Sequence, residues 1–174
     1  MFDTNCVFPL MLLLSRCNGN VTPNITLGEL WTTGVINWNQ ISANMPVMVK
    51  FDNFSPAKCV GKSDDNTALV VKRSGCYYLD YLVNISNFVA AGTSPAYNGI
   101  EVYMAVNGNP VSSPVKLDPT GSLSGRVTSV ATDKIESVWL NRCDKISLML
   151  RASANGTSMT VTPSAWLDAA YLGG

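Results

Sequence analysis

The sequence of 174 residues contains no histidine, and this absence excludes several classes of enzyme. Histidine is the usual general base at neutral pH and the commonest transition-metal ligand, so Ser-His-Asp triads and Cys-His dyads are ruled out. Ser-Lys and paired-carboxylate chemistry remain open, but no recognisable motif supports either. We therefore expect a protein that is not an enzyme, and we assign no catalytic, cofactor-binding or metal-binding residue.

Charge is also scarce. Lys plus Arg and Asp plus Glu both number 12, and charged residues make up 14% of the chain. Without a basic run or a net positive charge, the chain lacks the usual footprint for nucleic acid or an anionic membrane surface. So low a charge density is typical of a subunit that buries part of its surface against copies of itself or a larger assembly.

The cysteines do not form a recognisable framework. The number of cysteines is odd, their spacing is wide, and none forms a Cys-x-x-Cys pair: Cys6, Cys17, Cys59, Cys76 and Cys143. We expect small, buried thiols in a chain that matured in reducing cytoplasm. The alternative is a bridge between Cys6 and Cys17, or an intermolecular bond from one of these two.

The N-terminal segment carries an apolar run, residues 7–14, that differs from a signal peptide. Asp3 precedes it with no Lys or Arg, Pro9 interrupts it, and no small-x-small cleavage site follows. The run is also shorter than the roughly 20 apolar residues that span a bilayer, so no transmembrane segment is expected. We expect its apolar side chains to dock on a neighbouring chain: Phe8, Leu10, Leu12, Leu13 and Leu14.

From residue 45 onward, short β-rich runs alternate with Gly, Pro and Asn turn signals, and no segment shows helical periodicity. This spacing predicts an all-β, double-sheet jelly-roll sandwich over residues 45–174. Residues 1–44 are expected to be an N-terminal attachment and connector segment. The expected strands outside residues 67–86 are Pro46–Asp52, Ile100–Val106, Val111–Leu117, Arg126–Ala131, Ile135–Leu140, Ile146–Arg151, Ser158–Val161 and Ala165–Leu172.

The best-patterned stretch is residues 67–86, where two β-rich runs flank Ser74-Gly75 and predict a hairpin. Successive strand side chains point to opposite faces, so the second run has two distinct sides. Its apolar face consists of Tyr77, Leu79, Tyr81, Val83 and Ile85. Its mixed face consists of Cys76, Tyr78, Asp80, Leu82 and Asn84.

Four motifs occur in an order that resembles the jelly rolls of complement globular heads and tumour necrosis factor, including the heads of bacterial collagen-like spore proteins and phage fibres. Residues 75–81 (Gly-Cys-Tyr-Tyr-Leu-Asp-Tyr) are similar to the family's Gly-x-Tyr-aromatic strand, and residues 104–111 to its Val-Asn-Gly hairpin. Residues 138–148 are similar to its Gly-Asp corner and residues 165–172 to its terminal strand. Arg142-Cys143 departs from the usual corner, and the chain has no collagen-like stalk.

The resemblance implies a homotrimer in which one sheet of each subunit packs around a three-fold axis. Alternation along the strands predicts which aromatic and polar side chains point out of the sandwich towards that axis. The expected trimer-interface residues are Tyr78, Asp80, Leu82, Trp139, Trp166, Asp168 and Ala170. The family's strand order also brings Asp80 and Asp168 together, where they need protons, cations or basic partners.

The favoured function is a structural module, a trimeric head fibre or capsid decoration of a bacteriophage, assembled in bacterial cytoplasm and placed on the virion surface. Its partners are further copies of itself and, through the N-terminal segment, other virion proteins. A host-surface receptor or glycan is a further candidate partner. The alternatives are a bacterial or spore-surface trimeric head and a secreted trimer that binds a receptor or glycan.

Overall fold

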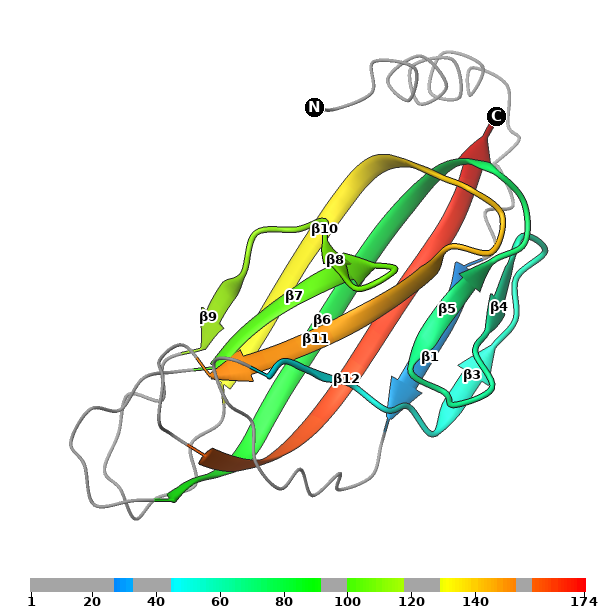
Figure 1. Cartoon of the computed structure of the whole chain (residues 1–174). Coiled ribbons are helices and arrows are strands. Elements are labelled where there is room, and N and C mark those ends of the chain that lie inside the picture. Colours follow the sequence, from blue (N-terminus) through cyan, green and yellow to red (C-terminus); the bar gives the residue numbers. More distant parts are fainter. Residues whose placement is uncertain (1–26, 33–44, 92–99, 118–128, 153–157) are drawn as a thin grey trace, which may run out of the picture.

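A computed structural model describes residues 27–32, 45–91, 100–117, 129–152 and 158–174, which form two antiparallel sheets packed face to face (Figure 1). None of the residues in these ranges is helical. The predicted double-sheet sandwich is therefore confirmed.

The first sheet, called here the β6/β12 sheet, is dominated by long strands, and it has the order β10-β6-β12-β1-β3. Its strands are β10 (Ser129–Leu140), β6 (Gly75–Ala91), β12 (Ser158–Gly173), β1 (Leu27–Thr32) and β3 (Asn53–Ser55).

The second sheet, called the β7/β11 sheet, has shorter strands in the order β4-β5-β11-β7-β8, with β2 paired to β11 and β9 to β7. Its strands are β4 (Val60–Lys62), β5 (Ala68–Val71), β11 (Lys145–Ala152), β7 (Ile100–Val106), β8 (Asn109–Pro110), β2 (Val47–Met48) and β9 (Val115–Leu117).

Alternation along β6 and β12 builds one wall of the core. Tyr77, Leu79 and Tyr81 on β6 are almost fully buried, and so are Leu167 and Ala169 on β12. Their neighbours in sequence point to the other side of the sheet, as strand geometry requires. The predicted apolar face of the 67–86 stretch is confirmed for these β6 residues.

The two core tyrosines keep hydrogen bonds for their hydroxyl groups. The Tyr77 hydroxyl donates to the backbone carbonyls of Arg73 at 2.6 Å and Cys59 at 3.2 Å, and the Tyr81 hydroxyl donates to the carbonyl of Val102 at 3.4 Å. Burial raises the pKa of Tyr77 to about 12 and the pKa of Tyr81 above its usual range. Both rings therefore stay neutral and bridge the two sheets.

The expected hairpin at Ser74-Gly75 is wrong, because β5 pairs with β4 and β11 while β6 pairs with β10 and β12. Both runs present apolar faces to the same core from opposite sheets, and a turn signal does not reveal whether its flanking strands share a ladder. Gly75 has a φ of 154°, and a Cβ there would lie 2.5 Å from the Tyr171 ring and 2.6 Å from the Gly173 carbonyl. The chain thus crosses between sheets where only glycine fits.

The Asn107-Gly108 turn is confirmed as a hairpin between β7 and β8. Both residues have positive φ, 52° and 81°, as a tight two-residue turn requires. Elsewhere, two pairs of expected strands are merged. Residues 129–140 form one strand with an irregularity between Ile135 and Val138, and β12 runs continuously through Pro163. Pairing along the length of β6 overrides these local breaks.

Strand β1 lies within the stretch expected to be a connector, and it pairs with β12 and β3 in the sandwich sheet. The domain boundary at residue 44 stays a prediction. Strand β1 lies before that boundary but belongs to the sandwich. The expected docking residues Phe8, Leu10, Leu12, Leu13 and Leu14 lie outside the described residues.

The cysteines only partly match expectation. Cys59 is free and buried, as predicted, whereas Cys143 is free but exposed. Cys76 is disulfide-bonded, so the expectation of reduced thiols is wrong at this position. Bridging depends on the approach of two Cα atoms in space, which irregular spacing along a chain does not reveal.

Candidate interaction surface

The outer face of the β6/β12 sheet, meaning the side turned away from the core, carries the predicted interface residues. Registers place Trp166 of β12 beside Leu82 of β6, Asp168 beside Asp80, and Ala170 beside Tyr78. Directly paired residues of an antiparallel ladder share a face. The predicted proximity of Asp80 and Asp168 is therefore confirmed by the register.

Strand β1 extends this face with residues that sequence reasoning missed. Leu27 pairs with Ala170, Glu29 with Asp168 and Trp31 with Trp166. The signal was present, since Leu27, Glu29 and Trp31 alternate with inward residues in a short strand pattern. A strand this short, lying in an expected connector, is hard to tell from extended chain by its pattern alone.

A row of charged side chains crosses the outer face from strand to strand. Glu29 on β1, Asp168 on β12, Asp80 on β6 and Lys134 on β10 are consecutive partners. Ser55 of β3 continues the row beyond Glu29. Three carboxyl groups thus share the row with one ammonium group, and we call this set the acidic row.

Asp168 occupies the centre of the acidic row. Its Oδ1 atom is buried and has no hydrogen-bond partner. Burial, together with the negative charges of Glu29 and Asp80, raises the pKa of Asp168 from 3.8 to about 6. Both causes disfavour the carboxylate, so Asp168 keeps its proton up to about pH 6.

Asp80 is better satisfied than its neighbour, because its Oδ2 accepts a hydrogen bond of 3.1 Å from the Tyr78 hydroxyl. A second orphaned atom lies further along β6, where Asn84 Oδ1 is buried without a partner. Buried polar atoms are nearly always paired in native proteins. Two unpaired, solvent-inaccessible acceptors thus lie within one face of the sheet.

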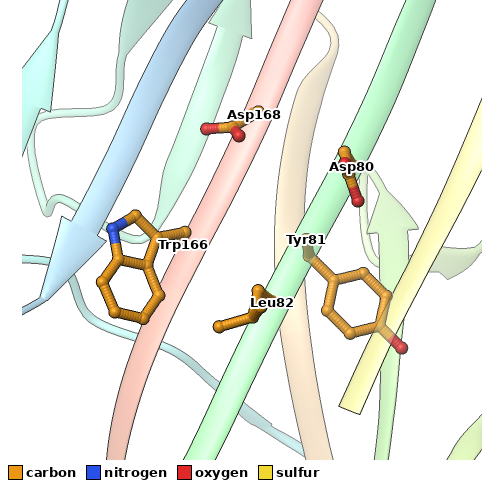
Figure 2. Close-up of a pocket in the computed structure, with 5 residues that line it drawn as sticks. All are labelled: Asp80, Tyr81, Leu82, Trp166 and Asp168. Carbon is orange, nitrogen blue, oxygen red and sulfur yellow. The ribbon is translucent and has the colours of Figure 1, made fainter. Parts of the chain in front are cut away.

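An open hollow of about 420 Å³ lies on this face, lined by Asp80, Tyr81, Leu82, Trp166 and Asp168 (Figure 2). In Figure 2 the Trp166 indole and the Leu82 side chain lie along one side, and the two carboxyl groups lie together at the other. The hollow therefore joins an apolar wall to an acidic one.

The remaining predicted interface residues differ in how much surface they offer. Trp139, near the end of β10 and paired with Cys76, is 41% exposed, and Leu82 is 39% exposed. Trp166 and Tyr78 are partly buried, while Ala170 is only 1% exposed between Leu27 and Tyr78. Ala170 has little surface left to bury against a partner. The interface itself stays a prediction.

Among the described residues, no three Cys, Asp or Glu side chains come together as a possible metal-binding group. Likewise, no helix within the described ranges is long and apolar enough to cross a membrane.

Comparison with solved structures identifies the architecture. The globular domain of a zebrafish complement 1qA protein matches with a TM-score of 0.53 and 13% identity, over 85% of this chain and 97% of that one. The chain shares the jelly-roll fold of this complement C1q domain. The Eiger TNF of S. frugiperda is also similar, with a TM-score of 0.41 and 10% identity over 84% and 92% of the two chains.

No model of a known protein family matches the sequence, and no curated protein matches it. The match to the complement 1qA domain confirms, at the level of fold, the C1q/TNF-like resemblance read from the four sequence motifs. A fold of this kind hosts many functions, so the function must be argued from the surface.

Proposed function

We propose that this protein is a non-enzymatic structural module that assembles as a homotrimer through the outer face of the β6/β12 sheet. The carrying observation is the composition of that face. It combines exposed apolar side chains, Leu27, Leu82 and Trp139, with two buried acceptors that have no partner. Aromatic side chains surrounded by polar ones are typical of protein contacts rather than of free surface.

The assembly is tested by native mass at micromolar concentration, using light scattering or mass spectrometry on the full chain. We expect a mass three times that of the subunit, and a strictly monomeric protein would contradict the proposal. Leu82→Ser is expected to weaken assembly at least tenfold. Met48→Ser is the matched control, since Met48 is similarly exposed, at 45%, but lies on the β7/β11 sheet.

We further propose that the trimer is a head fibre or capsid decoration of a bacteriophage, attached through its N-terminal segment. Low charge density and the apolar run at residues 7–14 support a subunit built into a larger particle. The test is the chain's location after gradient purification of phage particles. Replacement of Leu12, Leu13 and Leu14 by Ser, which leaves every cysteine in place, is expected to release the trimer from the particle without dissociating it.

The second candidate is a trimeric head on a bacterial or spore surface, or a secreted trimer that binds a receptor or glycan. The disulfide at Cys76 favours it, because disulfides persist in oxidising surroundings. Fractionation separates the two candidates. Sedimentation with phage particles supports the virion role, whereas recovery from a cell wall or spore coat supports the second candidate.

A further inference from the structure

The acidic row poses an electrostatic problem for any contact made by the outer face of the β6/β12 sheet. Glu29, Asp168 and Asp80 are consecutive across three strands, and Lys134 on β10 is the row's ammonium group. The row therefore carries an excess of negative charge when all its members are ionised. Removing that excess from water is costly unless it is neutralised.

We propose that the outer face of the β6/β12 sheet is a proton-gated contact between copies of this chain, which close on it when Asp168 is protonated and separate when the whole acidic row is ionised. The inference rests on the proposed trimer and adds that pH controls its assembly. Assembly removes this face from water, so carboxylates of the row that have no counter-charge become costlier to keep ionised.

A second copy is the occupant that the row's own charges favour. Its carboxyl groups lie on β1, β12 and β6, whereas its ammonium group lies on the sheet-edge strand β10. In a head-to-tail cyclic contact the edge strand of one copy approaches the carboxyl groups of the next, so the two ends of the row are complementary in charge. The row has three carboxyl groups for one ammonium group, so contact between copies still leaves negative charge to be neutralised.

Asp168 is the group that takes the proton, because of what faces it from each neighbouring strand. On β1 it faces Glu29, and on β6 it faces Asp80, which accepts a hydrogen bond from the Tyr78 hydroxyl. Lys134 lies one strand further away, and Ser55 lies beyond Glu29. Protonation also removes one negative charge from the centre of the row and turns the carboxyl group into a hydrogen-bond donor.

The direction of the pH dependence follows from the burial of Asp168. Its pKa, raised to about 6 in the free subunit, rises further when a second copy excludes water. Each subunit then binds up to one proton on assembly. By linkage, the concentration for half-assembly of a trimer rises up to about 30-fold per pH unit above about pH 6 and is constant well below it.

The test is sedimentation of the full chain over a concentration series, at several pH values between about 5 and 8, with and without a chelator. We expect trimers at pH 5 and dissociation as pH rises through 6 to 8. Asp168→Asn is expected to abolish this dependence and keep the chain assembled at pH 8. Asp64→Asn, an equal charge change at an exposed loop residue, is expected to behave as wild type.

Glu29→Gln provides a second variant that does not alter Asp168 itself. Removing its negative charge is expected to weaken the pH dependence, because the row then carries less excess negative charge and Asp168 holds its proton less tightly. Circular dichroism checks that each variant is folded.

Assembly that is equally tight from pH 5 to 8 in the wild type, or Asp168→Asn with wild-type pH dependence, would overturn the inference and leave the trimer standing. Dissociation caused by the chelator would overturn it in favour of a bound cation. A chain that is monomeric at every pH would overturn the trimer as well.

Discussion

Gly75 shows how one residue decides the connection between the sheets. It follows the turn that carries the chain from β5 to β6, and it packs against Tyr171 and the backbone of Gly173. At a φ of 154° a side chain is strained whatever the surrounding space. The close contacts add a steric cost that no shift of a flexible side chain removes, because one of them is backbone.

Gly75→Ala is expected to lower the free energy of unfolding by about 2–4 kcal/mol. The measurement is denaturant-induced unfolding followed by tryptophan fluorescence. Gly108→Ala is the matched control, because Gly108 also has positive φ but nothing lies within 4 Å of the position that its Cβ would take. Its expected cost is about 1–2 kcal/mol, and equal losses in the two variants would contradict the steric argument.

Asp168 predicts a pH dependence of stability as well as of assembly. Its pKa is 3.8 ordinarily and about 6 in the folded chain, so the folded state binds the proton more tightly. Stability is therefore greatest below about pH 4, falls as pH rises to about 6, and is then level with respect to this group.

Asp168→Asn removes this penalty. We expect it to raise the free energy of unfolding at pH 7 by about 1 kcal/mol, a figure that allows for solvent screening, and to change it little at pH 4. The measurement is urea unfolding at one low protein concentration at both pH values. The opposite result, a variant that unfolds more easily than wild type at pH 7, would show that the carboxylate is favourable in the folded chain.

At the scale of the element, β6 presents two faces with different roles. Leu79 is fully buried in the core, whereas Leu82 on the opposite face is 39% exposed. The same residue type thus tests folding on one side of the strand and association on the other.

Leu79→Ala is expected to cost about 2–5 kcal/mol in the free energy of unfolding, because it leaves a cavity between the sheets. Leu82→Ala is expected to cost about 1 kcal/mol or less in the isolated subunit but to weaken assembly. Thermal melts and sedimentation of both variants separate the two effects. Equal destabilisation of the subunit would contradict the assignment of Leu82 to the outer face.

Strand β6 also shows where local patterns succeed and fail. Alternation placed Tyr77, Leu79 and Tyr81 in the core correctly, because the period of a strand is local geometry. The prediction that β5 pairs with β6 is wrong. The apolar faces of these two strands can be buried equally well in one sheet or in two facing sheets, so their patterns do not decide the pairing.

At the scale of the whole molecule, the two sheets differ in their outer surfaces. The β6/β12 sheet carries the acidic row beside Leu82 and Trp166. On the β7/β11 sheet, Glu101 and Arg151 form an ion pair of 2.6 Å, and the Arg151 guanidinium lies over the Tyr103 ring. This pair is thus satisfied within one chain, whereas the acidic row has an excess of carboxyl groups, so the first sheet is the stronger candidate for assembly.

Trp139 provides an intrinsic probe of that assembly. It is 41% exposed in the subunit, and we expect a trimer to bury much of this surface. Acrylamide quenching is expected to fall as the concentration rises through the assembly range. In a Trp139→Phe variant the concentration dependence is expected to diminish. Quenching of Trp139 that is unchanged on assembly would place the contact elsewhere.

Local patterns in the sequence establish the all-β class, the alternation of β6 and β12, the Asn107-Gly108 hairpin and the outward direction of Asp80, Trp139 and Asp168. These follow from side-chain period and turn chemistry, which act over a few residues. Three further features come from the folded chain: β5 and β6 lie in different sheets, β1 adds Glu29 beside Asp168, and Cys76 is bridged. Each of these depends on contacts between segments distant in the chain, which local patterns do not encode.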